Sequence, residues 1–178
     1  KNGAQLVLNP VLETELLSGD GRAYGLELFV RKRSGRLTGW ISYTLSRSEV
    51  IVAGNSPEET INSGDWYSSN WDKTHDLTIV GMYQITDRWS GGANFIYTTG
   101  RPASYPEGRF NFDGKVAPIY RFRNEYRIPS TIRLDISATR EGKKRENFET
   151  SWVFGVYNVL GRKNPYSVFF QPDENMPT

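Results

Sequence analysis

The amino-acid sequence predicts an all-β protein whose main body is an antiparallel, up-and-down sheet. Apolar and polar residues alternate with a period of two in several runs, which is the pattern of a strand with two different faces. The 178 residues include 17 Gly, 9 Pro and 13% aromatic residues, a composition typical of strands joined by turns. The connections between the runs are alternately short and long. These three observations together predict six strands arranged as three hairpins.

The first hairpin is expected near the start of the chain. Leu26, Leu28 and Val30 share one face of its first run, because alternate residues of a strand point to the same side. In its second run, 37–46, apolar residues fill most of one set of alternate positions and hydroxyl residues most of the other. A Ser-Gly pair at 34–35 between the two runs has the chemistry of a tight hairpin turn.

The second and third hairpins follow the same pattern. Runs 76–85 and 89–98 alternate and are joined by a Thr-Asp turn. Run 132–139 also alternates, and the charged segment 141–146 joins it to a return strand at 147–159. The face of that return strand is ambiguous, because apolar residues occur in both of its registers.

Two long connections separate the hairpins. They span 23 residues at 49–71 and 30 residues at 101–130, and both contain many polar residues, glycines and prolines. Loops longer than about 12 to 15 residues are uncommon in compact soluble domains. Transmembrane β-barrels, in contrast, have short turns at one end and long loops at the other.

The lengths of the runs also favour a barrel that crosses a membrane. Runs of about 10 to 12 residues fit a tilted strand across a bilayer and exceed the five or six residues common in globular strands. Aromatic residues that fit interface girdles lie near the run ends: Tyr24, Trp89, Tyr97 and Tyr157. We therefore expect a transmembrane β-barrel with apolar side chains toward lipid and polar ones toward a wet interior.

Composition excludes several other classes of protein. No stretch approaches the roughly 18 apolar residues of a membrane helix. The sequence has no cysteine and a single histidine, His75, so thiolate chemistry and multi-histidine metal sites are ruled out. A net charge of +2 is too small to predict nucleic-acid binding. We expect neither catalytic activity nor a bound metal or cofactor.

Several short segments resemble the recurring strand and loop phrases of one protein family. Their order and spacing along the chain carry the resemblance, since no one of them is specific. The segments are 24–28, 39–48, 74–77, 99–102, 124–127, 129–135, 157–159 and 162–166. From about residue 21 to residue 170 the chain resembles the C-terminal barrel region of TonB-dependent outer-membrane receptors of the Bacteroidota type.

This resemblance implies a barrel of roughly 22 strands with a plugged lumen. Residues 1–178 would form a partial C-terminal region of that barrel with about six of its strands. The plug domain and the family's final strand, which ends in an aromatic residue, are absent from this sequence. The resemblance therefore implies a fragment of a receptor.

The resemblance also implies a location, a function and a set of partners. Such a receptor lies in the outer membrane of a Gram-negative bacterium and imports a bulky, scarce solute, such as a siderophore, vitamin, oligosaccharide or peptide. Its partners would be outer-membrane lipid and lipopolysaccharide, the rest of the barrel and its plug, the TonB system acting through that plug, and in some cases a lipoprotein lid. The long connections would be extracellular and the short turns periplasmic.

The long connections carry the candidate ligand-binding residues. Arginine forks suit carboxylate or phosphate groups, and aromatic faces suit organic rings. The candidates are Trp66, Tyr67 and Trp71 in the first connection and Arg101, Tyr105, Arg109, Tyr120, Arg121 and Arg123 in the second. The alternative is that these residues pack the loops, anchor them at the membrane interface or pair with lipopolysaccharide phosphates.

Charged residues in the strands are candidates for the interior wall of the barrel. Glu27, Arg31, Asp76, Arg133 and Asp135 occupy the polar positions of their runs. They could contact a plug or line a permeation route, or they could pair across strands and stiffen the wall.

Two other functions remain open at this stage. One is a structural or adhesive outer-membrane β-barrel without transport activity. The other is a soluble β-sandwich or small closed barrel that serves as a binding module, since 178 residues suffice for about eight strands.

Overall fold

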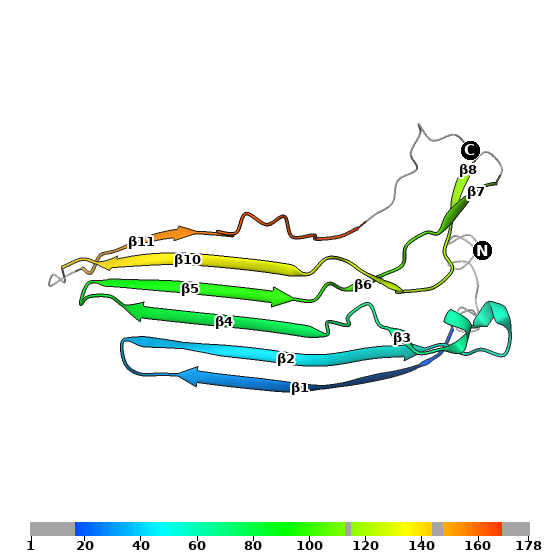
Figure 1. Ribbon diagram of the computed structural model, residues 1–178, viewed down its shortest axis with the longest axis horizontal. Helices are drawn as coiled ribbons and strands as arrows, with labels where there is room; N and C mark the ends of the chain where they lie inside the picture. The colour runs from blue at the N-terminus through cyan, green and yellow to red at the C-terminus, as the bar shows by residue number, and fades with distance from the viewer. Residues whose placement is uncertain (1–16, 113–114, 144–147, 169–178) are drawn as a thin grey trace.

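The computed structural model of the chain describes residues 17–112, 115–143 and 148–168. Its main sheet is antiparallel and follows the order β1-β2-β4-β5-β10-β11, so neighbouring strands are also successive long segments of the chain (Figure 1). The strands are β1 (Asp20–Lys32), β2 (Leu37–Ile51), β4 (His75–Gln84), β5 (Trp89–Thr98), β10 (Thr131–Glu141) and β11 (Ser151–Val156). The all-β, antiparallel, up-and-down arrangement predicted from the sequence is confirmed, and the sheet is open.

Short and long connections lie at opposite ends of this sheet (Figure 1). Residues 33–36 join β1 to β2 and residues 85–88 join β4 to β5. At the other end, residues 52–74 and 99–130 form the two long connections. The alternation of short and long connections predicted from the sequence is therefore present. We call these two segments the first and the second long connection.

The long connections contain regular structure that the sequence did not predict. The first has two 3-10 turns, η2 (Pro57–Glu59) and η3 (Asn62–Gly64), and the short strand β3 (Tyr67–Ser68), which pairs with the end of β2. The second folds back on itself twice. Its elements are β6 (Pro102–Ala103) paired with β9 (Tyr126–Arg127), and β7 (Gly108–Phe112) paired with β8 (Lys115–Ile119).

The third hairpin differs most from its prediction. Residues 144–147, which cover part of the predicted turn and the start of the return strand, lie outside the described residues. The described part of the return strand, β11, has only six residues. Beyond it the backbone turns, with positive φ at Asn158 and Gly161. The side-chain amide of Asn164 then bonds to both the N–H and the C=O of Ile132, so a non-strand segment covers the edge of β10.

The register places apolar residues on one face of the sheet. Residues directly opposite one another in an antiparallel pair have side chains on the same face. Leu28, Tyr43, Leu77, Tyr97 and Ile132 follow one another in this way across five strands. We call this side the apolar face. Its other large members are Leu26, Val30, Leu37, Ile41, Leu45, Ile79, Tyr83, Trp89, Phe95, Leu134, Ile136, Trp152, Phe154 and Val156.

The opposite side, which we call the polar face, carries most of the serine, threonine and amide side chains of the strands. Thr44, Asp76, Thr98 and Thr131 form one cross-strand row on it. The face is mixed rather than uniformly polar, because Phe29 packs against Trp40 there with ring centroids 6.0 Å apart.

Three of the four predicted girdle residues lie on the apolar face, namely Tyr24, Trp89 and Tyr97. Tyr157 does not follow this pattern, because its hydroxyl accepts a hydrogen bond of 2.7 Å from Arg133 of the polar face.

The register also decides which side chains of the ambiguous return strand lie on each face. Phe154 pairs with Ala138 and Val156 with Ile136, so both belong to the apolar face.

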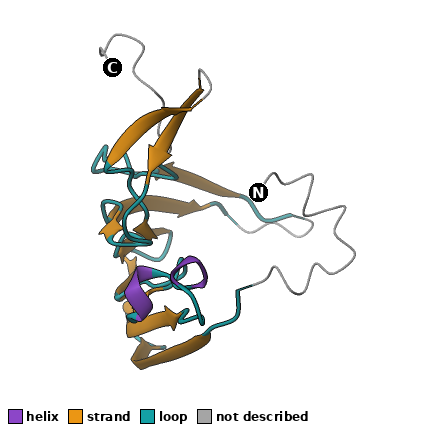
Figure 2. Cartoon of the chain, turned by 90° about the vertical axis from the view of Figure 1, so that its right-hand side faces the viewer, coloured by secondary structure: helices purple, strands orange, loops and turns teal. Residues whose placement is uncertain are grey.

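Among the described residues the sheet has no buried apolar core. No hydrophobic residue there is buried, and Leu26 and Phe154 are 66% and 55% exposed. Seen from the long-connection end, the described strands form a single layer (Figure 2). No helix in these ranges is long and apolar enough to cross a membrane. The described residues therefore place no protein layer over the apolar face.

Candidate functional site

The two long connections meet at one end of the sheet and carry opposite charge. The first, 52–74, has four acidic residues and one lysine. The second, 99–130, has six arginines and lysines and three acidic residues. Opposite charges attract over a distance of about 10 Å at moderate salt. The two segments therefore favour contact with each other.

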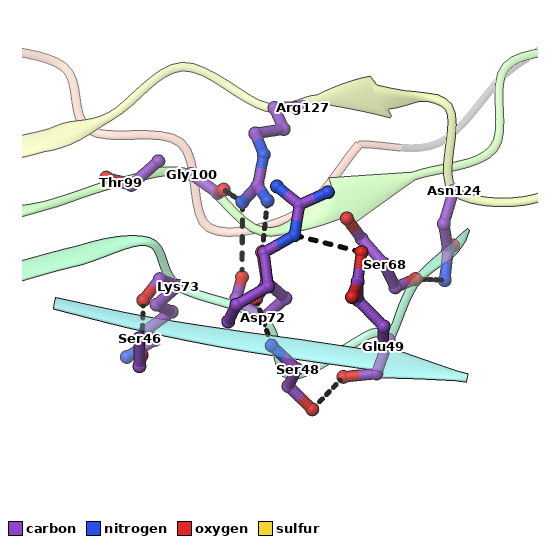
Figure 3. Close-up of polar contacts among 12 residues, drawn as sticks. Ser46, Ser48, Glu49, Ser68, Asp72, Lys73, Thr99, Gly100, Asn124 and Arg127 are labelled. Carbon is purple, nitrogen blue, oxygen red and sulfur yellow. Dashed lines mark hydrogen bonds and ion pairs between the residues drawn. The ribbon is translucent and has the colours of Figure 1, made fainter. Parts of the chain in front are cut away.

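An ion pair between Asp72 and Arg127 joins the two long connections. Asp72 is 1% exposed, and no larger side chain among the described residues is fully buried. Arg127 Nη2 bonds to Asp72 Oδ2, and its Nη1 donates to the carbonyl oxygens of Asp72 and Gly100 at 3.3 and 3.1 Å. Figure 3 shows Arg127 reaching from the second connection toward Asp72.

The second oxygen of the Asp72 carboxylate is bonded as well. The backbone N–H of Ser48 in β2 donates to Asp72 Oδ1 at 2.6 Å (Figure 3). A buried carboxylate loses its hydration and is stable only when its oxygens are bonded and its charge is balanced. Asp72 meets both conditions, so β2 and the two long connections are held together at one carboxylate.

Two asparagines continue this junction through backbone contacts. Asn62 donates from Nδ2 to the carbonyl of Arg123 at 2.8 Å and accepts from its N–H at 2.7 Å, in the manner of a paired strand residue. Asn124 donates from Nδ2 to the Ser68 carbonyl and to Asn70 Oδ1, at 2.8 and 2.7 Å. Asn124 has a φ of +58°, a region that asparagine tolerates better than most residues.

A second charged cluster lies at the end of β2, beyond the last residue that β2 pairs with β4. Glu49 is 6% exposed and accepts bonds from Arg22 and Arg47 at 2.7 and 3.1 Å. Desolvation raises the pKa of its carboxyl, but the hydrogen bonds and charges of the two arginines outweigh this and hold the pKa below its usual value. The Arg22 guanidinium also stacks on Trp66, 4.1 Å from the ring centroid.

Three hollows surround residues 120–125 of the second connection. Their volumes are about 330, 530 and 320 Å³. Arg123 lines all three, and each hollow shares further residues with one of the others. The guanidinium of Arg123 makes no hydrogen bond among the described residues, because the two bonds of this residue to Asn62 involve only its backbone. We call the combined region the loop hollow.

Six of the nine predicted ligand-binding residues line the loop hollow. These are Trp66, Tyr67, Trp71, Tyr120, Arg121 and Arg123. The structure thus brings together candidates that the sequence separates by about fifty residues. Sequence reasoning missed Arg47 and Asn62, which also line the hollow, and it missed the Asp72 to Arg127 ion pair. The opposite charges of the two connections were the available signal for that pair.

The other three candidates lie away from the loop hollow. Arg101 donates to the carbonyl of Tyr166 at 3.4 Å. Tyr105 stacks on Tyr126 with ring centroids 4.9 Å apart. Arg109 lies in β7, opposite Pro118 of β8. Tyr105 therefore packs within the second connection, and Arg101 joins that connection to the segment after β11.

The five predicted wall residues all lie on the polar face, but they do not form a continuous ladder of charge. Glu27 and Arg31 form no ion pair among the described residues. Asp76 lies 3.8 Å from Lys73. Arg133 and Asp135 pair along their own strand at 3.1 Å, and Asp135 also accepts from Asn94 across the sheet. The polar face is thus joined by local pairs.

The described ranges contain no group of three or more histidine and acidic side chains that could hold a metal ion. Comparisons of the chain with models of protein families, with curated proteins and with solved structures found no match.

Proposed function

We propose that this chain forms part of the wall and long loops of a transmembrane β-barrel in the outer membrane of a Gram-negative bacterium. We further propose that the barrel is a TonB-dependent receptor that imports a bulky, scarce solute. The observation that carries the first proposal is the single-layer sheet, whose apolar face has no protein over it in the described ranges.

Contact of this face with lipid would be more favourable than contact with water. Burial of apolar area stabilises a protein by roughly 25 cal/mol per Å², and the described sheet gains little of that from its own packing. Leu26, Ile41, Ile79 and Ile136, on four different strands, remain 36% to 66% exposed. Acyl chains against this face would remove these side chains from water, while the polar face would remain hydrated.

The receptor proposal rests on the resemblance described above and on the loop hollow. Aromatic rings, together with guanidinium groups that have no ion-pair partner among the described residues, suit a solute that carries both rings and anionic groups. Trp66 and Tyr67 come from the first connection and Arg121 and Arg123 from the second. A solute bound there would contact both connections.

The experiment uses the full-length protein in outer-membrane vesicles. The chain has no cysteine, so a single cysteine can be introduced at each test position of this region and labelled with a small fluorophore. I79C and I136C test the apolar face, and T78C and S137C are the matched neighbours on the polar face. We expect nitroxide-bearing acyl chains to quench labels at 79 and 136 strongly and labels at 78 and 137 weakly.

A second measurement in the same system addresses transport. Energised solute uptake should require the full-length protein and should fall on R121A/R123A substitution but not on R88A substitution at the short-turn end. Equal quenching on both faces would contradict the membrane wall and favour a soluble binding module. Alternating quenching without uptake of any tested solute would favour a structural or adhesive barrel.

A further inference from the structure

The short-turn end of the sheet is strongly basic. Residues 31–36, 85–88 and 139–143 contain seven arginines and lysines but only two acidic residues. These three segments lie side by side because they join or end adjacent strands at the same edge of the molecule (Figure 1). These three segments therefore carry an excess of positive charge at one end of the sheet.

Part of this charge lies on the apolar face. Lys32 is opposite Gly39, which is opposite Gly81, and this row belongs to the apolar face. Arg140 is opposite Trp89 on one side and Trp152 on the other. Its guanidinium lies 5.7 Å from the centroid of the Trp89 ring and makes no hydrogen bond among the described residues.

Arg36 extends the same arrangement across the first two short turns. Its guanidinium donates to the carbonyl oxygens of Gln84 and Ile85 at 3.2 and 2.7 Å. It also lies 5.9 Å from the ring centroid of Tyr83, which is on the apolar face. Cations and aromatic rings thus lie together along the edge of this face. We call Lys32, Arg36, Tyr83, Trp89, Arg140 and Trp152 the basic rim.

The other end of the apolar face differs in charge. There Arg22 and Arg47 are both paired with Glu49, so their charge is partly neutralised within the protein. Neither acidic residue of the short-turn segments neutralises the basic rim. Asp87 lies in the turn between β4 and β5. Glu141 is on the polar face, because it occupies the same set of alternate positions in β10 as Ser137 and Thr139.

We propose that the basic rim binds the phosphate groups of anionic phospholipids in the leaflet at the short-turn end of the barrel. Tryptophan and tyrosine rings favour the region of the lipid headgroups. Lysine and arginine side chains there extend toward phosphate, which guanidinium binds through paired hydrogen bonds. The occupant must supply acyl chains for the exposed rings and an anionic group for the cations, and a phospholipid supplies both. This inference rests on the proposed membrane wall.

The test places one fluorophore beside the basic rim, at L37C, in the full-length protein. Leu37 is 51% exposed and lies opposite Tyr83 on the apolar face. The protein is reconstituted in phosphatidylethanolamine bilayers containing a fixed share of phosphatidylglycerol. Quenching is then compared when the nitroxide is on the phosphatidylglycerol or on the phosphatidylethanolamine.

We expect phosphatidylglycerol to be enriched at the label. The K32Q/R140Q variant should reduce this enrichment by about fivefold for each cation lost, and added salt should also weaken it. R31Q/R33Q is the matched control, since it removes two charges from the same end while Arg31 lies on the polar face. All of these residues are exposed, so both variants should fold.

The outcomes separate the two proposals. Equal quenching by both lipids, or equal loss in the control variant, would overturn the basic rim as a lipid site while leaving the membrane wall intact. A label at 37 that neither lipid quenches would overturn the membrane wall itself, and the basic rim with it.

Discussion

The strands and the long connections of this chain are stabilised in opposite ways. In the six strands of the main sheet, large apolar residues such as Leu26 remain exposed and no apolar side chain is buried. In contrast, the buried polar residues Glu49, Ser69 and Asp72 lie at the long-connection end, as do the buried Gly100 and Pro102. Soluble domains normally bury apolar side chains and expose polar ones.

The difference indicates what each region needs from its surroundings. The long connections satisfy their own polar groups, since the Asp72 carboxylate is bonded by Arg127 and by the Ser48 amide. The sheet satisfies only its backbone and leaves its apolar face to something outside the described chain. The long connections therefore satisfy their buried polar groups within the protein, whereas the apolar face of the sheet needs an apolar environment outside the described residues.

The largest expected effect is at the buried carboxylate. The D72A substitution would leave Arg127 without its partner and the Ser48 amide without its acceptor. Loss of one member of a buried pair costs about 3 to 5 kcal/mol. We expect faster hydrogen exchange at Ser48 and in both long connections, measured on the full-length protein. D65A, at an exposed aspartate in the same connection, is the control. Unchanged exchange in D72A would show that the ion pair does not hold the connections together.

A charge placed on the apolar face should have the next largest effect. I79R or L134R should lower the free energy of unfolding by about 2 to 4 kcal/mol if these side chains meet hydrocarbon at mid-membrane. T78R, one residue away on the polar face, should cost far less. Urea unfolding of the lipid-reconstituted protein measures both. Equal penalties on the two faces would reject the assigned polarity.

Two paired glycines should give the smallest effect. Gly39 and Gly81 lie directly opposite each other, but Gly39 has a φ of +150° and an added Cβ would overlap the carbonyl oxygen of Val80. An added Cβ on Gly81 meets no atom within 4 Å. G39A should therefore cost about 1 to 3 kcal/mol, and G81A should change stability by less than about 0.5 kcal/mol. Similar unfolding midpoints for the two variants would show that β2 relaxes at this position.

Alternation in the sequence predicted most of the sheet. The two faces of β4 and β5 could be assigned before the structure, because every second residue of a strand points to the same side. Where apolar residues filled both sets of positions, as in β11, only pairing with Ile136 and Ala138 decided the face. The two small hairpins of the second connection were missed, since strands of two to five residues carry too few positions to show a period.

The candidate site was predicted as residue types but not as an arrangement. Tryptophans, tyrosines and arginines in the long connections were identified, yet Tyr105 stacks within the second connection and Arg101 bonds to the segment after β11. Asp72 and Arg127 are 55 residues apart, and nothing local to either residue indicates the other. Their contact depends on how two long segments fold against each other at the same end of the sheet.

The sequence by itself determined the strands, their turns and the chemistry of each face, because these depend on neighbours one or two positions away. The tertiary structure alone decided that a carboxylate, rather than an apolar cluster, would be the most buried group, and which cations would lie beside tryptophans at the opposite end. Those outcomes depend on contacts between segments that are distant in the sequence. The free energy of burying a charge depends on the partner atoms around it, and the local sequence pattern does not specify those atoms.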